Sequence, residues 1–189
     1  MRKYLLVGRT GVGKSSFINS VFGQYIAETA EYEACTRVLE HYAYSSPWGD
    51  VCLIDTPGLA EDDLDCDNKY LDLICQKVNL RETFATFYVT RLDDTRFRPD
   101  EKRTLSRLTK HLGKQIWSRT ILILTFAASV PSHRRKEATN QRKEDIQNYL
   151  QQISGGQFRQ FHDSWLIDNI VQKWSDNSVS ISTIFKNTK

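Results

Sequence analysis

The residues that most constrain this chain run from Gly8 to Ser15 and read GRTGVGKS, a complete match to the pattern G-x-x-x-x-G-K-[ST]. An apolar stretch at 4–7 precedes them, and residues 16–22 carry apolar side chains at helical spacing. In this order of strand, glycine loop and helix, the loop N–H groups and the helix dipole both face a bound polyphosphate. The pattern therefore predicts a phosphate-binding loop, with a merely structural glycine turn as the alternative.

The positions of this loop have separate expected roles. Lys14 is expected to reach the β- and γ-phosphates, and Ser15 to offer its hydroxyl to Mg²⁺. The phosphates are also expected to be surrounded by backbone groups of the neighbouring residues Arg9, Thr10, Gly11, Val12, Gly13 and Ser16.

Length and composition are those of one globular domain. The 189 residues are 40% apolar and 26% charged, and the net charge of +3 gives no case by itself for a nucleic acid partner. We expect a single domain over 1–189, with a core to residue 171 and a tail or helix over 172–189. No apolar run approaches the length of a membrane span. Four cysteines without a C-x-x-C pair predict reduced thiols in a cytoplasmic compartment: Cys35, Cys52, Cys66 and Cys75.

A second motif follows the apolar strand expected at 50–54 and reads DTPG over 55–58. A strand that ends in Asp55 supplies a carboxylate for the water shell of Mg²⁺, and the N–H of Gly58 is placed to meet a γ-phosphate. A kinase built on a glycine loop does not need this sequence, whereas a switch of the GTPase type does. The motif therefore favours a GTPase.

Acidic side chains crowd residues 59–68, which invites a calcium-binding interpretation. An EF-hand counted from Asp63 would need Gly at position 68 and Glu at position 74, where this chain has Asn68 and Ile74. The segment is therefore expected to be a solvated, mobile switch region rather than a metal-binding loop.

Strands and helices alternate along the chain, which predicts an α/β fold with a mostly parallel six-stranded sheet, helices on both faces and the nucleotide at the carboxyl ends of the strands. The strands are expected at 4–7, 36–44, 50–54, 83–89, 120–125 and 161–167, and a turn at 45–49. The helices are expected at 16–22, 69–79, 99–112 and 134–153, and a mobile loop at 24–35.

Three stretches together carry a resemblance to a known family: GRTGVGKSSFINSVFG at 8–23, LIDTPGL at 53–59, and FYVTRLDDTRF followed by HLGKQIW and ILILT within 87–125. They resemble the septin-like, AIG-type P-loop GTPases, in particular the chloroplast import receptor (Toc-type) GTPases and the immunity-associated GTPases. The resemblance implies a Ras-like G domain, Mg²⁺ with GTP or GDP as ligands, and a homodimer formed through the nucleotide face.

The guanine-reading motif N/T-K-x-D is absent, and TFAA stands at 125–128 in its place. The resemblance implies that this loop, with Thr125 and Phe126, contacts the base, that the Phe126 ring stacks on it, and that Asp168 and Asn169 read its edge. The alternative is that Phe126 is a core aromatic residue and that Asp168 and Asn169 form an ordinary turn.

Hydrolysis is expected to be slow, because Leu59 stands where Ras-type enzymes place a glutamine that orients water. The resemblance implies that Arg96 contacts the nucleotide of a dimer partner. The alternative is that Arg91 and Arg96 pair with Asp93 and Asp94 on the surface. Thr36 is expected to close on Mg²⁺ when γ-phosphate is present, with Thr29 as the second choice.

These residues favour a slow, Mg²⁺-dependent GTPase that acts as a dimerisation-linked switch in the cytoplasm or at the periphery of a membrane. The alternative is a nucleotide-loaded scaffold or receptor with negligible turnover that binds a peptide or a membrane-protein partner. RNA binding is disfavoured because no RNA-binding module accompanies the one basic helix face, formed by Arg134, Arg135, Lys136, Arg142 and Lys143.

Overall fold

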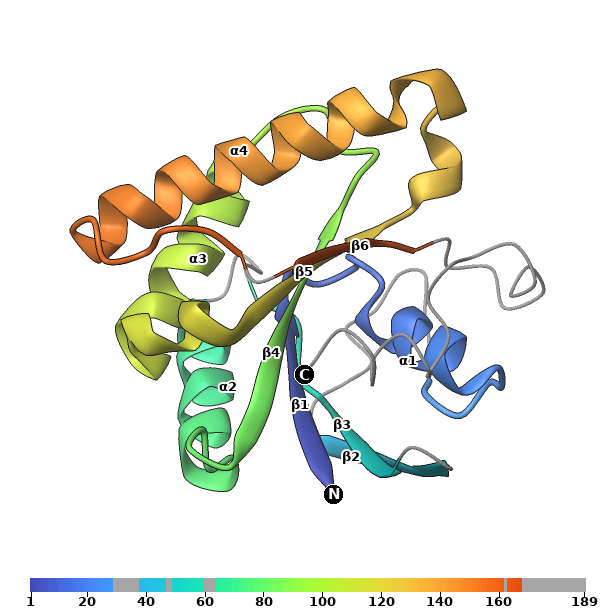
Figure 1. Ribbon diagram of the computed structural model, residues 1–189. Coiled ribbons are helices and arrows are strands. Elements are labelled where there is room, and N and C mark those ends of the chain that lie inside the picture. Colours follow the sequence, from blue (N-terminus) through green and yellow to red (C-terminus); the bar gives the residue numbers. More distant parts are fainter. Residues whose placement is uncertain (29–37, 47–48, 60–63, 162, 168–189) are drawn as a thin grey trace.

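The computed structural model describes residues 1–28, 38–46, 49–59, 64–161 and 163–167. Six strands form one sheet in the order β2-β3-β1-β4-β5-β6 (Figure 1). The β2–β3 pair is antiparallel and the other four pairs are parallel, so the predicted mostly parallel sheet is confirmed. The strands are β1 (Arg2–Gly8), β2 (Glu40–Ser46), β3 (Gly49–Asp55), β4 (Thr83–Arg91), β5 (Thr120–Thr125) and β6 (Asp163–Leu166).

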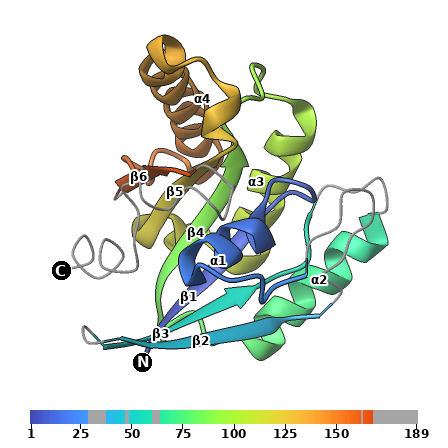
Figure 2. The ribbon, with the colours of Figure 1, turned by 90° about the vertical axis from the view of Figure 1, so that its right-hand side faces the viewer.

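Helices cover both faces of this sheet (Figures 1 and 2). One face packs against α1 (Lys14–Phe22), and the other against α2 (Leu64–Lys77), α3 (Pro99–Leu112) and α4 (Arg135–Ser154). Short 3₁₀ helices follow α3 and β5 and precede α4: η1 (Lys114–Arg119), η2 (Ala127–Ser129) and η3 (Ser132–Arg134). None of the helices in the described ranges is long and apolar enough to cross a membrane.

Strand β1 shows why the core has two halves. Its side chains alternate between the faces, so Tyr4 and Leu6 join the cluster that contains α1, while Leu5 and Val7 join the cluster beneath the other three helices. All four are fully buried, as expected for a central strand covered on both sides. This packing holds the carboxyl end of β1, where the glycine loop begins.

Several predicted boundaries were wrong. Helix α2 begins at Leu64, so part of the segment expected to be a mobile loop is helical, and Asp65 and Asp67 favour its first turn through the helix dipole. Strand β2 continues to Ser46, into the predicted turn. Helix α1 already begins at Lys14, and η1 was not predicted. The predicted tail at 172–189 lies outside the described residues.

Candidate nucleotide site

The glycine loop joins β1 to α1 at the carboxyl edge of the sheet. Gly13 is the N-cap of α1 with φ 89°, a left-handed conformation that a residue with a side chain adopts only at a cost. Lys14, only 7% exposed, turns back over the loop, where its Nζ donates to the carbonyl of Arg9 at 3.0 Å and reaches that of Gly8 at 3.5 Å. The Lys14 ammonium therefore lies against two backbone carbonyls of the glycine loop at the start of α1, where its positive charge suits a bound polyphosphate.

A hydroxyl and a carboxylate meet beside this loop. Ser15 Oγ donates to Asp55 Oδ2 at 2.8 Å, and the other oxygen of Asp55 accepts the N–H of Thr56 at 3.0 Å. Burial raises the pKa of Asp55, while the nearby charge of Lys14 and the hydrogen bond from Ser15 lower it by less. Two hard oxygen ligands at the mouth of a phosphate loop fit Mg²⁺, which takes few protein ligands and fills its octahedron with water and phosphate oxygens.

The segment after β3 lies directly against the glycine loop. Leu59 N–H donates to the carbonyl of Gly8, and Thr10 N–H donates to the carbonyl of Leu59, both at 3.1 Å. A Cβ on Gly58 would lie 2.4 Å from Cα of Thr10, so only glycine allows this approach. The Leu59 side chain is fully buried in the core, so it does not face a water at the phosphates.

Thr125 supports the glycine loop from below. This fully buried residue ends β5, and its hydroxyl lies 2.7 Å from the carbonyl of Val12 and 3.0 Å from that of Thr90. A hydroxyl has one proton, so one of these carbonyls accepts it at a time. The side chain of Thr125 thus holds the loop in place, whereas the sequence placed it only in the base loop.

Phe126 follows in a left-handed conformation, with φ 55° and ψ 33°. It is half-buried and belongs to neither core cluster, so it is not a core aromatic residue. The guanidinium of Arg91 lies 3.8 Å from the ring centroid, and Asp93 holds that guanidinium through two hydrogen bonds of 2.8 and 2.9 Å. The guanidinium therefore lies over the aromatic ring and helps to fix it at the carboxyl edge of the sheet.

Strand β6 brings the chain to the same place. Ile167 N–H donates to the carbonyl of Leu124 at 2.8 Å, and Ala127 N–H donates to the carbonyl of Ile167 at 3.2 Å. These bonds span Phe126 on both sides, so the residue that precedes Asp168 lies against the base loop. Asp168, Asn169, Thr36 and Thr29 lie outside the described residues.

The segment between β4 and α3 carries Arg96. Arg91 pairs with Asp93, but Asp94 pairs with Arg98 at 2.9 Å, and no described residue forms an ion pair with Arg96. The alternative pairing on the surface is thus found for Arg91, and within the described residues it is not found for Arg96. Its side chain is exposed, as a group that acts on a second molecule must be.

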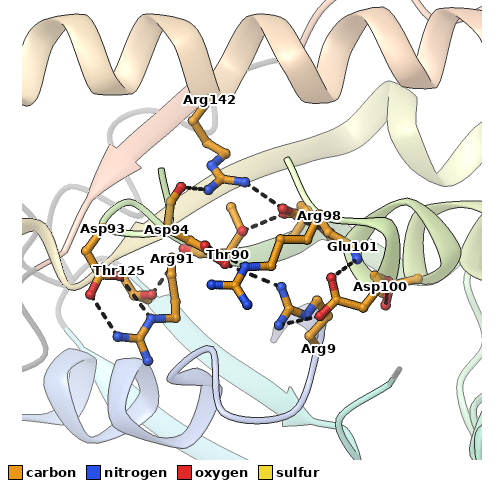
Figure 3. A network of polar contacts seen from close by, with 12 residues as sticks. Arg9, Thr90, Arg91, Asp93, Asp94, Arg98, Asp100, Glu101, Thr125 and Arg142 are labelled. Carbon is orange, nitrogen blue, oxygen red and sulfur yellow. Dashed lines mark hydrogen bonds and ion pairs between the residues drawn. The ribbon is translucent and has the colours of Figure 1, made fainter. Parts of the chain in front are cut away.

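Two arginines have surroundings that the sequence did not reveal (Figure 3). The Arg9 side chain pairs with Asp100 at 2.8 Å and Asp94 at 3.6 Å. Arg142, assigned above to the basic helix face, is 4% exposed and pairs with Glu101 at 2.6 Å. Its spacing of four and eight residues from the core residues Ile146 and Leu150 was the available signal.

Comparison with known proteins identifies relatives of this chain. The profile of the AIG1 family matches residues 2–162. Translocase of chloroplast 90 of Arabidopsis thaliana is 33% identical over 159 residues, which cover 79% of this chain and 20% of that protein. Translocase of chloroplast 33 of the same plant is 34% identical over 129 residues, which cover 67% of this chain and 42% of that protein. The chain thus spans about a fifth of the first of these relatives and about two fifths of the second.

Solved structures show the same fold. A crystal structure of Arabidopsis thaliana Toc33 in complex with GDP and Mg²⁺ has a TM-score of 0.81 at 23% identity and covers 99% of this chain and 82% of that one. A structure of Era in complex with MgGDPNP and ribosomal RNA has a TM-score of 0.72 at 14% identity and covers 98% of this chain and 56% of that one.

Proposed function

Because the chain belongs to the AIG1 family, we propose that it binds GTP and GDP with Mg²⁺ and acts as a nucleotide-controlled switch that hydrolyses GTP slowly. One observation carries the proposal: Ser15 Oγ and Asp55 Oδ2 lie 2.8 Å apart beside a glycine loop that holds the Lys14 ammonium. Solved structures of Toc33 contain GDP or GMPPNP together with Mg²⁺, which supports the choice of ligands.

The residues divide by the part of the nucleotide that they would meet. Lys14 and the N–H groups of the glycine loop bind the phosphates, and the N–H of Gly58 meets the γ-phosphate. Ser15 and Asp55 would hold Mg²⁺, with Thr36 as the proposed third ligand, and the metal would neutralise charge on the phosphates. Phe126 stacks on the base, and Asp168 and Asn169 read its edge.

Lys14→Ala tests the phosphate site. Loss of a charged hydrogen-bond donor should weaken binding of a nonhydrolysable GTP analogue about 10–100-fold, measured with Mg²⁺ present. Arg119→Ala is the control, because Arg119 is an exposed arginine that ends η1 just before β5, at the end of that strand away from the glycine loop. Binding by Lys14→Ala as tight as that of the wild type would show that the site is assigned wrongly.

Hydrolysis is proposed to depend on a homodimer formed through the nucleotide face. Leu59 is buried and cannot hold a water, so we expect a cation from a second protomer to stabilise the charge that develops on the phosphates. Arg96 is exposed and has no ion pair among the described residues. For the chloroplast translocon components Toc33 and Toc159, dimerisation is important for the GTPase activity, which supports this proposal. Arginines supplied in trans accelerate hydrolysis about 10³–10⁵-fold where hydrolysis depends on them.

The test measures phosphate release and sedimentation on the same samples from dilute to concentrated protein. Turnover per subunit should rise with concentration, because the competent species is the dimer. Arg96→Ala should flatten this rise and leave monomer affinity for GTP nearly intact, while Arg119→Ala should follow the wild type. Arg96→Ala that dimerises poorly but keeps its turnover per dimer would make Arg96 an interface residue.

A second candidate is a nucleotide-loaded scaffold with negligible turnover, and the buried Leu59 favours it. It predicts a wild-type rate that is low and constant at all protein concentrations, with nucleotide still bound. Both candidate functions are compatible with a peptide or membrane-protein partner. Both are also compatible with a location in the cytoplasm or at the periphery of a membrane.

A further inference from the structure

The loop between β4 and α3, residues 92–98, lies over a hollow. Leu92, Asp94 and Thr95 border a cavity of about 270 Å³ together with Val130 after β5 and several residues of α4. Within this loop Leu92 is the one buried residue, and its N–H donates to the carbonyl of Thr125 at 2.9 Å. Apolar packing therefore anchors the loop at Leu92 and again near its end, where the half-buried Phe97 ring meets that of Tyr149, and polar contacts hold the backbone between them.

Arg142 supplies one of these contacts from α4 (Figure 3). One guanidinium nitrogen donates to Glu101 at 2.6 Å, and another donates to the backbone carbonyl of Asp94. Glu101 is itself fixed, since its other oxygen accepts from Thr90 Oγ1 at 2.6 Å and lies 3.4 Å from the Tyr88 hydroxyl. The guanidinium is thus held on one side by a buried carboxylate and itself holds the loop backbone on the other.

Arg9 supplies a second contact from the glycine loop. It pairs with Asp94 and with Asp100, the second residue of α3, while Arg98 takes the remaining oxygen of Asp94. Asp94 therefore meets three arginines, two at its carboxylate and one at its carbonyl. Because Arg9 lies within the loop that would surround the phosphates, this contact links the phosphate site to residues 92–98.

We propose that Arg142 and Arg9 are positioning residues that hold the 92–98 loop so that Arg96 is presented from a fixed place at the nucleotide edge. Arg96 follows Asp94 by two residues, so its backbone lies within about 7 Å of the anchored carbonyl along the chain. Neither arginine side chain has to touch nucleotide for this. The use of Arg96 on a second protomer rests on the proposed function, whereas the anchoring of the loop does not.

Three variants separate anchoring from folding. Arg142→Lys keeps a cation beside Glu101 but loses the planar fork that makes both contacts at once. The double variant E101M/R142M removes both buried charges together, so that neither charge is left uncompensated, while the hydroxyls of Thr90 and Tyr88 lose Glu101 as their acceptor. Asp100→Asn weakens the link to Arg9 and keeps the side-chain oxygen that accepts the N–H of Glu101 at 2.9 Å. Lys143→Ala, at the neighbouring position on α4, is the matched control.

Hydrogen–deuterium exchange of the nucleotide-free protein tests the anchoring. Peptides that cover 92–98 should exchange faster in all three variants than in the wild type and in Lys143→Ala, while peptides from β1 and β5 stay unchanged. Equal exchange across 92–98 in every variant would overturn the proposal, whatever the GTPase activity.

Phosphate release against protein concentration tests the consequence. A misplacement of about 1 Å costs up to about 100-fold in rate, so turnover per dimer should fall about 10–100-fold in Arg142→Lys, with monomer affinity for the GTP analogue unchanged within about twofold. Wild-type turnover per dimer in all three variants would refute the positioning role. A wild-type rate without concentration dependence would refute the proposed function and leave the exchange result to decide on the anchoring.

Discussion

Thr125→Val removes the hydroxyl under the glycine loop and changes the shape of the side chain very little. The threonine is fully buried, and its Oγ1 lies 2.7 Å from the carbonyl of Val12. A buried acceptor that loses its donor costs about 1–3 kcal/mol, so the free energy of unfolding should fall by that amount. The loop should also become less ordered before nucleotide binds.

The effect on binding follows from the same contact. Fixing the backbone of one residue in a single conformation costs about 1–2 kcal/mol of conformational entropy. The hydrogen bond from Thr125 fixes Val12 before nucleotide binds, so binding does not have to meet this cost. Without the hydroxyl, the dissociation constant for a nonhydrolysable GTP analogue should therefore rise about 5–30-fold. Titration calorimetry measures it, and urea unfolding of the nucleotide-free protein measures the stability.

Thr120→Val is the matched control at the other end of β5. Thr120 is also fully buried and donates to a backbone carbonyl, that of Ile116, at 2.8 Å. It should lose similar stability and keep wild-type affinity. A Thr125→Val protein that is destabilised and yet binds as tightly as the wild type would refute the argument, and equal weakening in both variants would show that only global stability matters.

Three further predictions concern the remaining parts of the site. Phe126→Ala and Phe126→Gly should both weaken GTP binding by about 1–3 kcal/mol, the contribution of a base–aromatic stack. The free energy of unfolding should be about 1 kcal/mol higher in the glycine variant than in the alanine variant, because φ is 55° at this position. Gly58→Ala should weaken GTP binding measured by titration, because the new Cβ would lie 2.6 Å from the N of Thr10; wild-type affinity would contradict this. Asp168→Ala should narrow the preference for GTP over ATP in competition binding, and an unchanged ratio would mean that another group reads the base.

The features that could be predicted from the sequence are those encoded by residues close together in the chain. The glycine loop and the strands β1, β3 and β5 are encoded by short local patterns, so their places were predicted to within a few residues. The start of α2 was missed because acidic residues favour both a solvated loop and the first turn of a helix, and only packing of the helix decides between them.

The buried environment of Arg142 could not be predicted from the charged sequence around it. Its partners Glu101 and Asp94 lie 41 and 48 residues away, and the run of basic neighbours concealed its inward direction. For Arg9, the motif specifies backbone groups around a phosphate and is silent on the side chain, which instead contacts Asp94 and Asp100. The roles assigned to Thr36, Asp168 and Asn169 stay predictions, since these residues lie outside the described ranges.

The hydrogen bonds of Ile167 around Phe126 have a consequence for the synthesis of the chain. The contacts described for the glycine loop lie within residues 8–125, so all of these residues have been synthesised once β5 has been made. The base half needs β6, which joins the sheet edge beside β5 only after α4 has been made. Since a domain folds as a unit, and both halves of this core include residues after α4 such as Phe161 and Trp165, a nascent chain that ends in α4 would contain the residues of the glycine loop without the packing that fixes them.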